Sequence, residues 1–154
     1  MNVNEDDFMG DVLLISSPDG ADIVLEKGLI KDCRNFDTAV YLSLLGGNDE
    51  DLNRRPKETW WGNLIEGTQE NEWISSEFGA MIKGFPLNSG NLRKAKDACK
   101  RDLDWILNEG GADNVDVELL AESSQRVKLS ATVSQEENKT GGGNYELQWQ
   151  GAVR

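Results

Sequence analysis

Carboxylates are the only plentiful side chains in this sequence that could carry acid–base chemistry. The chain of 154 residues contains 28 aspartates and glutamates and no histidine. The lack of histidine excludes the commonest general base, the Ser/His and Cys/His nucleophile systems and most zinc sites. A glycosidase would need two carboxyl groups about 5 to 10 Å apart across a cleft, one of them with a raised pKa. The candidates are Glu72, Glu77 and Asp104, because predicted helices could display them beside a groove.

Two further stretches have the composition of ligand-binding loops without their context. Residues 48–51 are acidic and follow two glycines, but they lack the alternating Asx positions and the terminal glutamate of a calcium loop. Residues 141–143 are three glycines, but a phosphate-binding loop opens a helix, whereas here we predict a strand to follow. We therefore predict no catalytic, metal-binding or cofactor-binding residues.

The two cysteines, Cys33 and Cys99, are far apart and have no CxxC spacing. Cys99 lies on the apolar stripe of a predicted helix, where a buried thiol behaves as a small hydrophobic group. We predict free thiols and no disulfide.

Adjacent tryptophans, Trp60 and Trp61, are followed by Gly62. Neighbouring side chains on a strand face opposite ways, so one indole can enter the core while the other needs a second surface. Either the N-terminal hairpin covers that second indole, or a partner protein does. Tryptophan is enriched at the energetic centres of interfaces, so we expect one of the two to contact a partner.

The longest regular segment is a helix predicted over residues 88–109. Asn88 or Ser89 can cap its first turn, and Gly110 with Gly111 can end it in the left-handed conformation. At about 1.5 Å per residue it is roughly 30 Å long, the width of a small domain, so it must lie across a sheet. Its apolar side chains recur every three or four residues, namely Leu92, Ala95, Cys99, Leu103 and Ile106.

From residue 114 onward the apolar period changes to two, which indicates strands with one wet face. Three antiparallel strands are predicted, over residues 114–122, 127–134 and 145–150. Residues 135–143 are polar and end in three glycines, so we expect a long mobile hairpin loop there.

Shorter elements precede the long helix. Apolar runs at 11–15 and 22–25 flank Pro-Asp-Gly and predict an N-terminal hairpin that Gly28 breaks. Residues 37–45 predict a short helix ended by glycines, and residues 71–83 predict a second amphipathic helix.

Composition indicates one α+β domain over residues 1–154, because 38% hydrophobic residues suffice for one core at this length. Within it we expect an N-terminal hairpin arm (1–30), a helical part (36–110) with two short helices and one long one, and a three-stranded antiparallel sheet (114–150).

The net charge of −12 argues against binding to nucleic acid, because such binding neutralises phosphates with lysine and arginine. No apolar run approaches the ~20 residues that span a bilayer, and the acidic start lacks the features of a signal peptide. We therefore expect synthesis in a cytosol, no membrane and no nucleic acid among the partners, and binding to other proteins.

Four stretches in order resemble the Mu-like phage tail family of gene product 46. They are FDTAVYLSLL, RRPKETWWGN, EFGAMIKG and a long helix that leads into NVDVELL. The Arg-Arg and Trp-Trp-Gly block is the most specific part, followed by DWILNEGGADNVDVEL, and the resemblance covers nearly the whole chain. Members of this family are baseplate proteins, similar in fold to the T-even wedge component once described as a lysozyme and to the wedge subunit of type VI secretion systems.

The resemblance implies a wedge protein at the junction of baseplate and sheath in a contractile tail, assembled in the host cytoplasm and carried in the virion. It implies no enzyme activity and no cofactor, and its partners would be other wedge and hub proteins, with the sheath as a further candidate. The T-even and type VI relatives carry Glu-Pro-Arg before the first sheet strand, where residues 109–114 here read EGGADN. The partner-binding residues that we predict are Arg54, Arg55, Trp60, Trp61 and Gly62.

Two other functions stay open at this point. One is a lysozyme-like peptidoglycan hydrolase of the tail, suggested by the former description of the relatives and by the supply of carboxylates. The other is an acidic adaptor or inhibitor unrelated to tails, which the negative charge allows.

Overall fold

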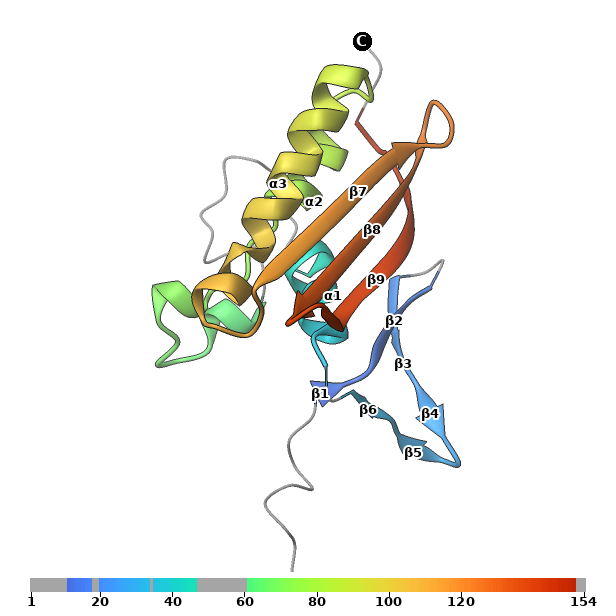
Figure 1. The fold of residues 1–154 in the computed structure, drawn as a ribbon. Helices are drawn as coiled ribbons and strands as arrows, with labels where there is room; N and C mark the ends of the chain where they lie inside the picture. Colours follow the sequence, from blue (N-terminus) through green and yellow to red (C-terminus); the bar gives the residue numbers. More distant parts are fainter. Residues whose placement is uncertain (1–10, 18–19, 34, 47–60, 152–154) are drawn as a thin grey trace, which may run out of the picture.

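The computed structural model describes residues 11–17, 20–33, 35–46 and 61–151. It is a mixed α+β protein, as the sequence predicts, in which the long helix α3 (Ser89–Asn108) packs on a C-terminal antiparallel sheet (Figure 1). The order of its strands is β7 (Asn114–Ala121), β8 (Arg126–Gln135) and β9 (Asn138–Gln148).

Helix α3 begins and ends on the residues that the sequence indicates. The side chain of Asn88 accepts the backbone N–H of Asn91 at 2.8 Å and so caps the first turn. Gly110 adopts φ 74°, and the N–H groups of Gly110 and Gly111 donate to carbonyls of the last turn at 3.1 and 2.9 Å. This pair of hydrogen bonds is the Schellman motif, which satisfies carbonyls that a helix end leaves without partners.

The second predicted helix, over residues 71–83, is wrong in its first half, because α2 is only Glu77–Gly84. The buried side chain of Asn63 bonds both backbone groups of Ile74, accepting its N–H and donating to its carbonyl at 2.8 Å each. These two bonds hold Ile74 outside any helix. Ser76 then accepts the N–H of Gly79 at 2.8 Å and caps α2.

The described residues of the helical part contain three other short helices. Helix α1 (Asp37–Leu45) matches the predicted segment 37–45. Two turns of 3-10 helix, η3 (Trp61–Leu64) and η4 (Glu70–Glu72), precede α2.

The long loop predicted over residues 135–143 is wrong, because β9 runs through the three glycines. Only Glu136 and Glu137 connect β8 to β9, and both have positive φ angles of 50° and 66°. A two-residue turn with positive φ at both positions matches the right-handed twist of a hairpin. The three glycines pair with β8, and the chain before α1 lies close to the first of them: a Cβ added to Gly141 would lie 2.6 Å from Cβ of Phe36.

This turn is strained as it stands, because glutamate disfavours positive φ. Replacing Glu136 and Glu137 with Asn-Gly is expected to raise the free energy of unfolding by about 1 kcal/mol, as measured by urea denaturation. The matched control, Glu136→Gln with Glu137→Gln, removes the same charges and keeps the strain. Equal stabilisation by both pairs would show that charge, and not backbone conformation, is responsible.

The N-terminal segment forms an arm of short antiparallel ladders that projects from the body (Figure 1). The predicted hairpin is present as the pair β2–β3, but the expectation that Gly28 ends it is wrong. Lys27 and Gly28, at φ 53° and 79°, form the tight turn of a second hairpin, β4–β5. The six strands are β1 (Asp11–Val12), β2 (Leu14–Ser17), β3 (Gly20–Ile23), β4 (Leu25–Glu26), β5 (Leu29–Ile30) and β6 (Asp32–Cys33).

The two hairpins and the β1–β6 pair meet at a junction of three residues. Leu13 N–H donates to the Lys31 carbonyl at 2.9 Å, Lys31 N–H donates to Val24, and Val24 N–H donates to Leu13. This closed ring of backbone bonds joins the three ladders. The buried hydroxyl of Thr38 in α1 ties the ring to the body, because it donates to the Val12 carbonyl at 2.6 Å.

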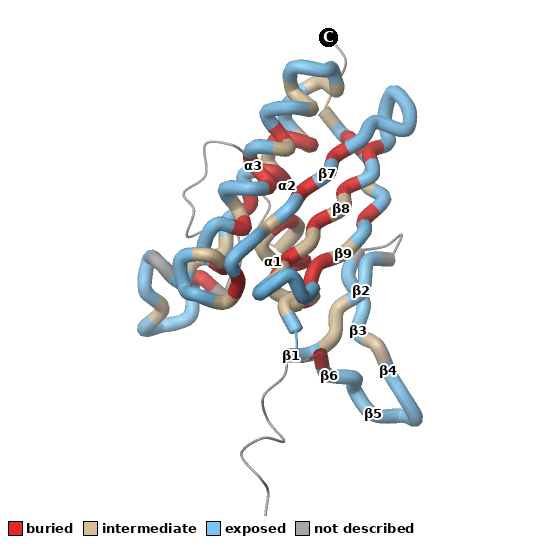
Figure 2. The backbone as a smooth tube through the Cα atoms, in the orientation of Figure 1, coloured by how far each residue is buried: buried red, intermediate tan, exposed pale blue. Residues whose placement is uncertain are grey.

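The core lies between the sheet and the helices, and the buried residues alternate along the strands as predicted (Figure 2). Cys33 and Cys99 are both buried and free, which confirms the expectation of free thiols. The fully buried side chains include Val40, Leu44, Phe78, Leu103, Ile106, Val117, Val127, Leu129 and Val133.

Candidate functional site

The predicted partner-binding block falls largely outside the described residues. Arg54, Arg55 and Trp60 belong to the part of the chain that is not described. Trp61 and Gly62 open the η3 turn, where the structure describes the backbone alone. Partner contact by this block stays a prediction.

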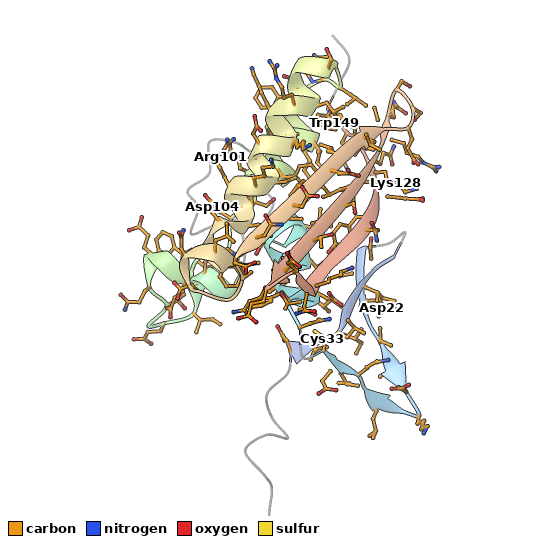
Figure 3. The ribbon with its side chains drawn as sticks, in the orientation of Figure 1. Asp22, Cys33, Arg101, Asp104, Lys128 and Trp149 are labelled. Carbon is orange, nitrogen blue, oxygen red and sulfur yellow. The ribbon has the colours of Figure 1, made fainter. Side chains whose placement is uncertain are left out.

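The three carboxylates considered for a hydrolase have separate surroundings. Glu77 is held by Arg101 through two hydrogen bonds of 2.8 and 2.9 Å, and this contact lowers the pKa of Glu77. Glu72 accepts the N–H of Gln69 at 2.7 Å and completes a capping box. Asp104 is exposed on α3 (Figure 3). The pKa shift of Glu77 is opposite to the one that an acid catalyst needs.

Asp102 is a partly buried carboxylate that the sequence does not indicate. It accepts backbone N–H groups of Glu77 and Phe78 at 3.0 and 2.9 Å and thus caps α2 from another helix. Ser76 Oγ lies 3.4 Å from the same carboxylate. Burial nevertheless raises the pKa of Asp102 to about 6, because desolvation of the charged form outweighs these hydrogen bonds. Its partners are 24 to 26 residues away in sequence, so no local pattern could indicate them.

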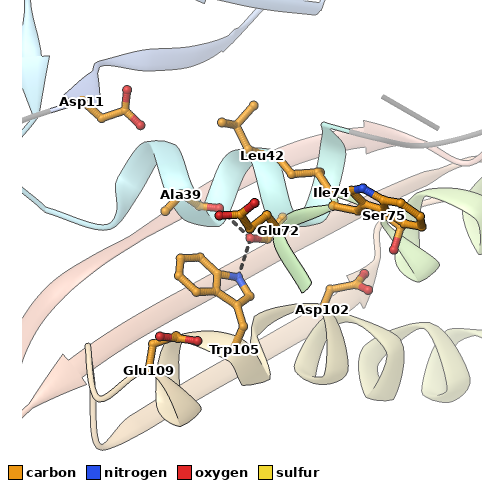
Figure 4. Close-up of a pocket in the computed structure, with 11 residues that line it drawn as sticks. Asp11, Ala39, Leu42, Glu72, Ile74, Ser75, Asp102, Trp105 and Glu109 are labelled. Atoms are coloured by element: carbon orange, nitrogen blue, oxygen red, sulfur yellow. Dashed lines mark hydrogen bonds between the residues drawn. The ribbon is translucent and has the colours of Figure 1, made fainter. Parts of the chain in front are cut away.

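Beside Asp102 lies an open groove of about 600 Å³ (Figure 4). We call it the Trp105 groove. Its walls are α1, residues 72–75 and the second half of α3. The side chains that give it its character are Leu42, Ser43, Glu72, Ile74, Asp102 and Trp105.

The indole of Trp105 is 42% exposed, yet its orientation is fixed. Its Nε1–H donates to Ser43 Oγ at 2.9 Å, and that hydroxyl donates to the Ala39 carbonyl at 2.8 Å (Figure 4). Two hydrogen bonds in series therefore hold an aromatic ring against α1 before any partner arrives.

A second surface is formed by exposed aliphatic residues on both faces of the arm, where Leu25 and Ile30 lie opposite each other across one ladder. Leu29 is 74% exposed and Leu25 62%, although both are large aliphatic residues. Two-stranded ladders have no interior of their own in which to bury such side chains. We call this set the arm surface, and its members are Ile15, Ile23, Leu25, Leu29 and Ile30.

A three-stranded sheet has two outer edges, and here the edge of β9 is closed at its start. Phe36 N–H donates to the Thr140 carbonyl at 3.0 Å, and Gly142 N–H donates to Asp37 Oδ1 at 3.0 Å. In the part of the chain that the structure describes, no strand pairs with the outer edge of β7.

Within the described ranges, no helix is long and apolar enough to cross a membrane. The same residues contain no group of three or more histidine, cysteine, aspartate or glutamate side chains that could hold a metal ion. Comparison of the chain with protein-family models, with curated proteins and with solved structures found no match.

Proposed function

We propose that this protein is a structural wedge subunit of a contractile phage or prophage tail baseplate, at the junction with the sheath. It acts by assembly with other wedge proteins and with hub proteins, and the sheath is a further candidate partner. Two things support the proposal: the resemblance in the Arg-Arg and Trp-Trp-Gly block, and the arm surface. The arm surface is the observation that carries it.

Covering the aliphatic side chains of the arm would stabilise a complex. Full burial of one leucine or isoleucine is worth about 1.5 to 3 kcal/mol, and Leu25, Leu29 and Ile30 gain little of this in the isolated chain. Exposed large aliphatic side chains that lie side by side, as Leu25 and Ile30 do across their ladder, mark contact surfaces. A partner that covers the arm would recover that free energy and could also pair with strand edges to which no described strand is hydrogen-bonded.

Replacing Leu25, Leu29 and Ile30 together with serine is expected to weaken incorporation into baseplates at least ~10-fold, because the apolar contact area is lost. The Lys27–Gly28 turn is unchanged, and none of the three side chains belongs to the core, so the monomer should remain folded. Incorporation is measured by quantitative mass spectrometry of tails purified from cells that express each variant, and folding by circular dichroism.

The matched control is Leu120→Ser, which alters a leucine of similar exposure (60%) on β7. It should leave incorporation unchanged. Wild-type incorporation of the triple variant would refute the role of the arm, and absence of the wild-type protein from purified tails would refute the proposed function itself.

A peptidoglycan hydrolase is the second candidate, and Asp102 is the observation in its favour. A carboxyl group with a pKa near 6 beside a groove is what a general acid requires. Both of its oxygens, however, already accept hydrogen bonds from the first turn of α2. A zymogram separates the candidates, because a cleared band abolished by Asp102→Asn would favour the enzyme.

A further inference from the structure

We propose that the Trp105 groove binds an arginine side chain presented by a partner protein. This inference adds a second contact, distinct from the arm surface, and rests on the proposed function only for the setting in which the partner is met.

The charge of the groove points to a cation. Asp11, Glu72, Asp102 and Glu109 line it, and no lysine or arginine is among its described lining residues. The whole chain carries a net charge of −12, which adds a field of the same sign. A cationic group entering the groove would therefore meet carboxylates, and none of the lining residues that the structure describes carries a positive charge to oppose it.

The fixed indole ring of Trp105 favours a planar cation over a compact one. Cations are attracted to the face of a tryptophan ring, and the hydrogen bond from Trp105 to Ser43 sets that ring in place beforehand. A guanidinium group is planar and more weakly hydrated than an ammonium group, so it can stack on an indole while it donates to a carboxylate. Leu42 and Ile74 offer an aliphatic wall for the three methylene groups of the side chain. Arginine satisfies all three features of the groove.

The size of the groove fits one side chain together with the backbone that presents it. Its volume of about 600 Å³ lies within the ~300–1,000 Å³ that is usual for ligand sites. Glu72 lies at the η4 turn and Glu109 at the end of α3, so the carboxylates approach the groove from different walls (Figure 4).

The probe for this proposal is N-acetyl-L-arginine amide. Its binding is monitored through the indole N–H signal of Trp105 in ¹H–¹⁵N NMR spectra. Loss of one signal in Trp105→Phe assigns the resonance. The assigned signal should shift saturably on titration, while the signal of Trp149, whose N–H is bound to the Phe85 carbonyl, should not. The citrulline analogue has the same shape without the charge and should give no saturable shift.

Matched variants test the carboxylates. Glu72→Gln with Glu109→Gln should weaken binding of the arginine probe roughly threefold, because two exposed charge contacts are lost while glutamine keeps the capping box of Glu72. Glu118→Gln with Glu146→Gln, on the sheet, should leave binding unchanged.

Four results would overturn the proposal. They are no shift with the arginine probe, equal binding of citrulline, equal binding of N-acetyl-L-lysine amide, and a response that occurs only after Arg54→Ala with Arg55→Ala. The last result would mean that an arginine of this chain, and not of a partner, occupies the groove. None of them bears on the arm experiment, so failure here and failure of the proposed function can be told apart.

Discussion

Replacing Gly141 with alanine is expected to lower the free energy of unfolding by about 3 kcal/mol, because a methyl group cannot be fitted there without moving backbone. A Cβ built on Gly141 would lie 2.6 Å from Cβ of Phe36, 2.7 Å from its N and 2.8 Å from its Cα. These atoms are fixed to the chain and cannot rotate away as the tip of a side chain could.

The surroundings of Phe36 leave it no room to retreat. Its N–H donates to Thr140, and the neighbouring Asp37 accepts the N–H of Gly142, so moving the segment breaks bonds to β9. The far end of the Phe36 ring is equally confined, because a Cβ on Gly111 would lie 2.6 Å from its Cζ. Phe36 thus fits between two glycine stretches that are 30 residues apart in the sequence, by the difference of 141 and 111.

Urea denaturation of wild type and Gly141→Ala measures this effect. The matched control is Gly90→Ala in the first turn of α3, where a Cβ meets nothing closer than 3.4 Å. Alanine favours a helix more than glycine, so this control should be neutral or up to ~1 kcal/mol more stable. If Gly141→Ala came within about 0.5 kcal/mol of wild type, the close packing of Phe36 on β9 would be contradicted.

Asp102→Asn is expected to remove a fall in stability that the wild type undergoes as the pH rises from about 4 to about 6. The folded pKa of Asp102 is raised from 3.8 to about 6, so in this range the folded state binds a proton that the unfolded state has released. Stability contributed by this group is therefore present at low pH and lost as the pH rises through the folded pKa. Above that range the contribution is constant.

The expected change in the free energy of unfolding follows from the pKa shift of Asp102. Two pKa units at 1.36 kcal/mol each set an upper limit of about 3 kcal/mol, and solvent screening at this partly exposed site reduces it to about 2 kcal/mol. The unfolding free energies of wild type and Asp102→Asn are measured at several pH values between 4 and 7, and their difference should decrease by that amount.

The difference in unfolding free energy between wild type and Asp102→Asn separates the contribution of Asp102 from those of other carboxylates. Glu77, whose pKa is lowered by Arg101, contributes with the opposite sign, but it does so in both proteins. Asp104→Asn, two residues further along α3, is the control for the loss of one exposed carboxylate from the same helix. A difference that rises with pH would mean that the hydrogen bonds to the anion outweigh its burial.

The elements that could be predicted are those whose signals are local. Helix α3 has its cap at Asn88, its apolar stripe and its Gly110 stop within a single stretch of sequence. Two of the sheet strands, β7 and β8, show alternation over eight residues and bury the predicted face. The hairpin β2–β3 follows from Pro-Asp-Gly. Each of these patterns depends on neighbours within a few residues, which a sequence displays directly.

The predictions that were wrong concern segments whose conformation is set by contacts between residues far apart in the sequence. Three glycines suggested a mobile loop, yet Gly141 lies in a strand that pairs with β8 and lies close to Phe36, 105 residues earlier by the difference of 141 and 36. Residues before Ser76 have helical spacing, yet the amide of Asn63 bonds the backbone of Ile74 and prevents the helix from starting there. In both cases a tertiary contact overrides a local preference worth less than about 1 kcal/mol per residue.

The features of the candidate sites likewise fall into those that the sequence displays directly and those that depend on the tertiary structure. From the sequence alone came an acidic chain without histidine and the Arg-Arg and Trp-Trp-Gly block, because composition and short motifs need no fold to be read. The tertiary structure alone decided that Trp105 is fixed by Ser43, 62 residues earlier, and that Asp102 caps a different helix. Grooves and pKa shifts arise from groups that only folding brings within a few ångströms of each other, and those distances are absent from the order of residues.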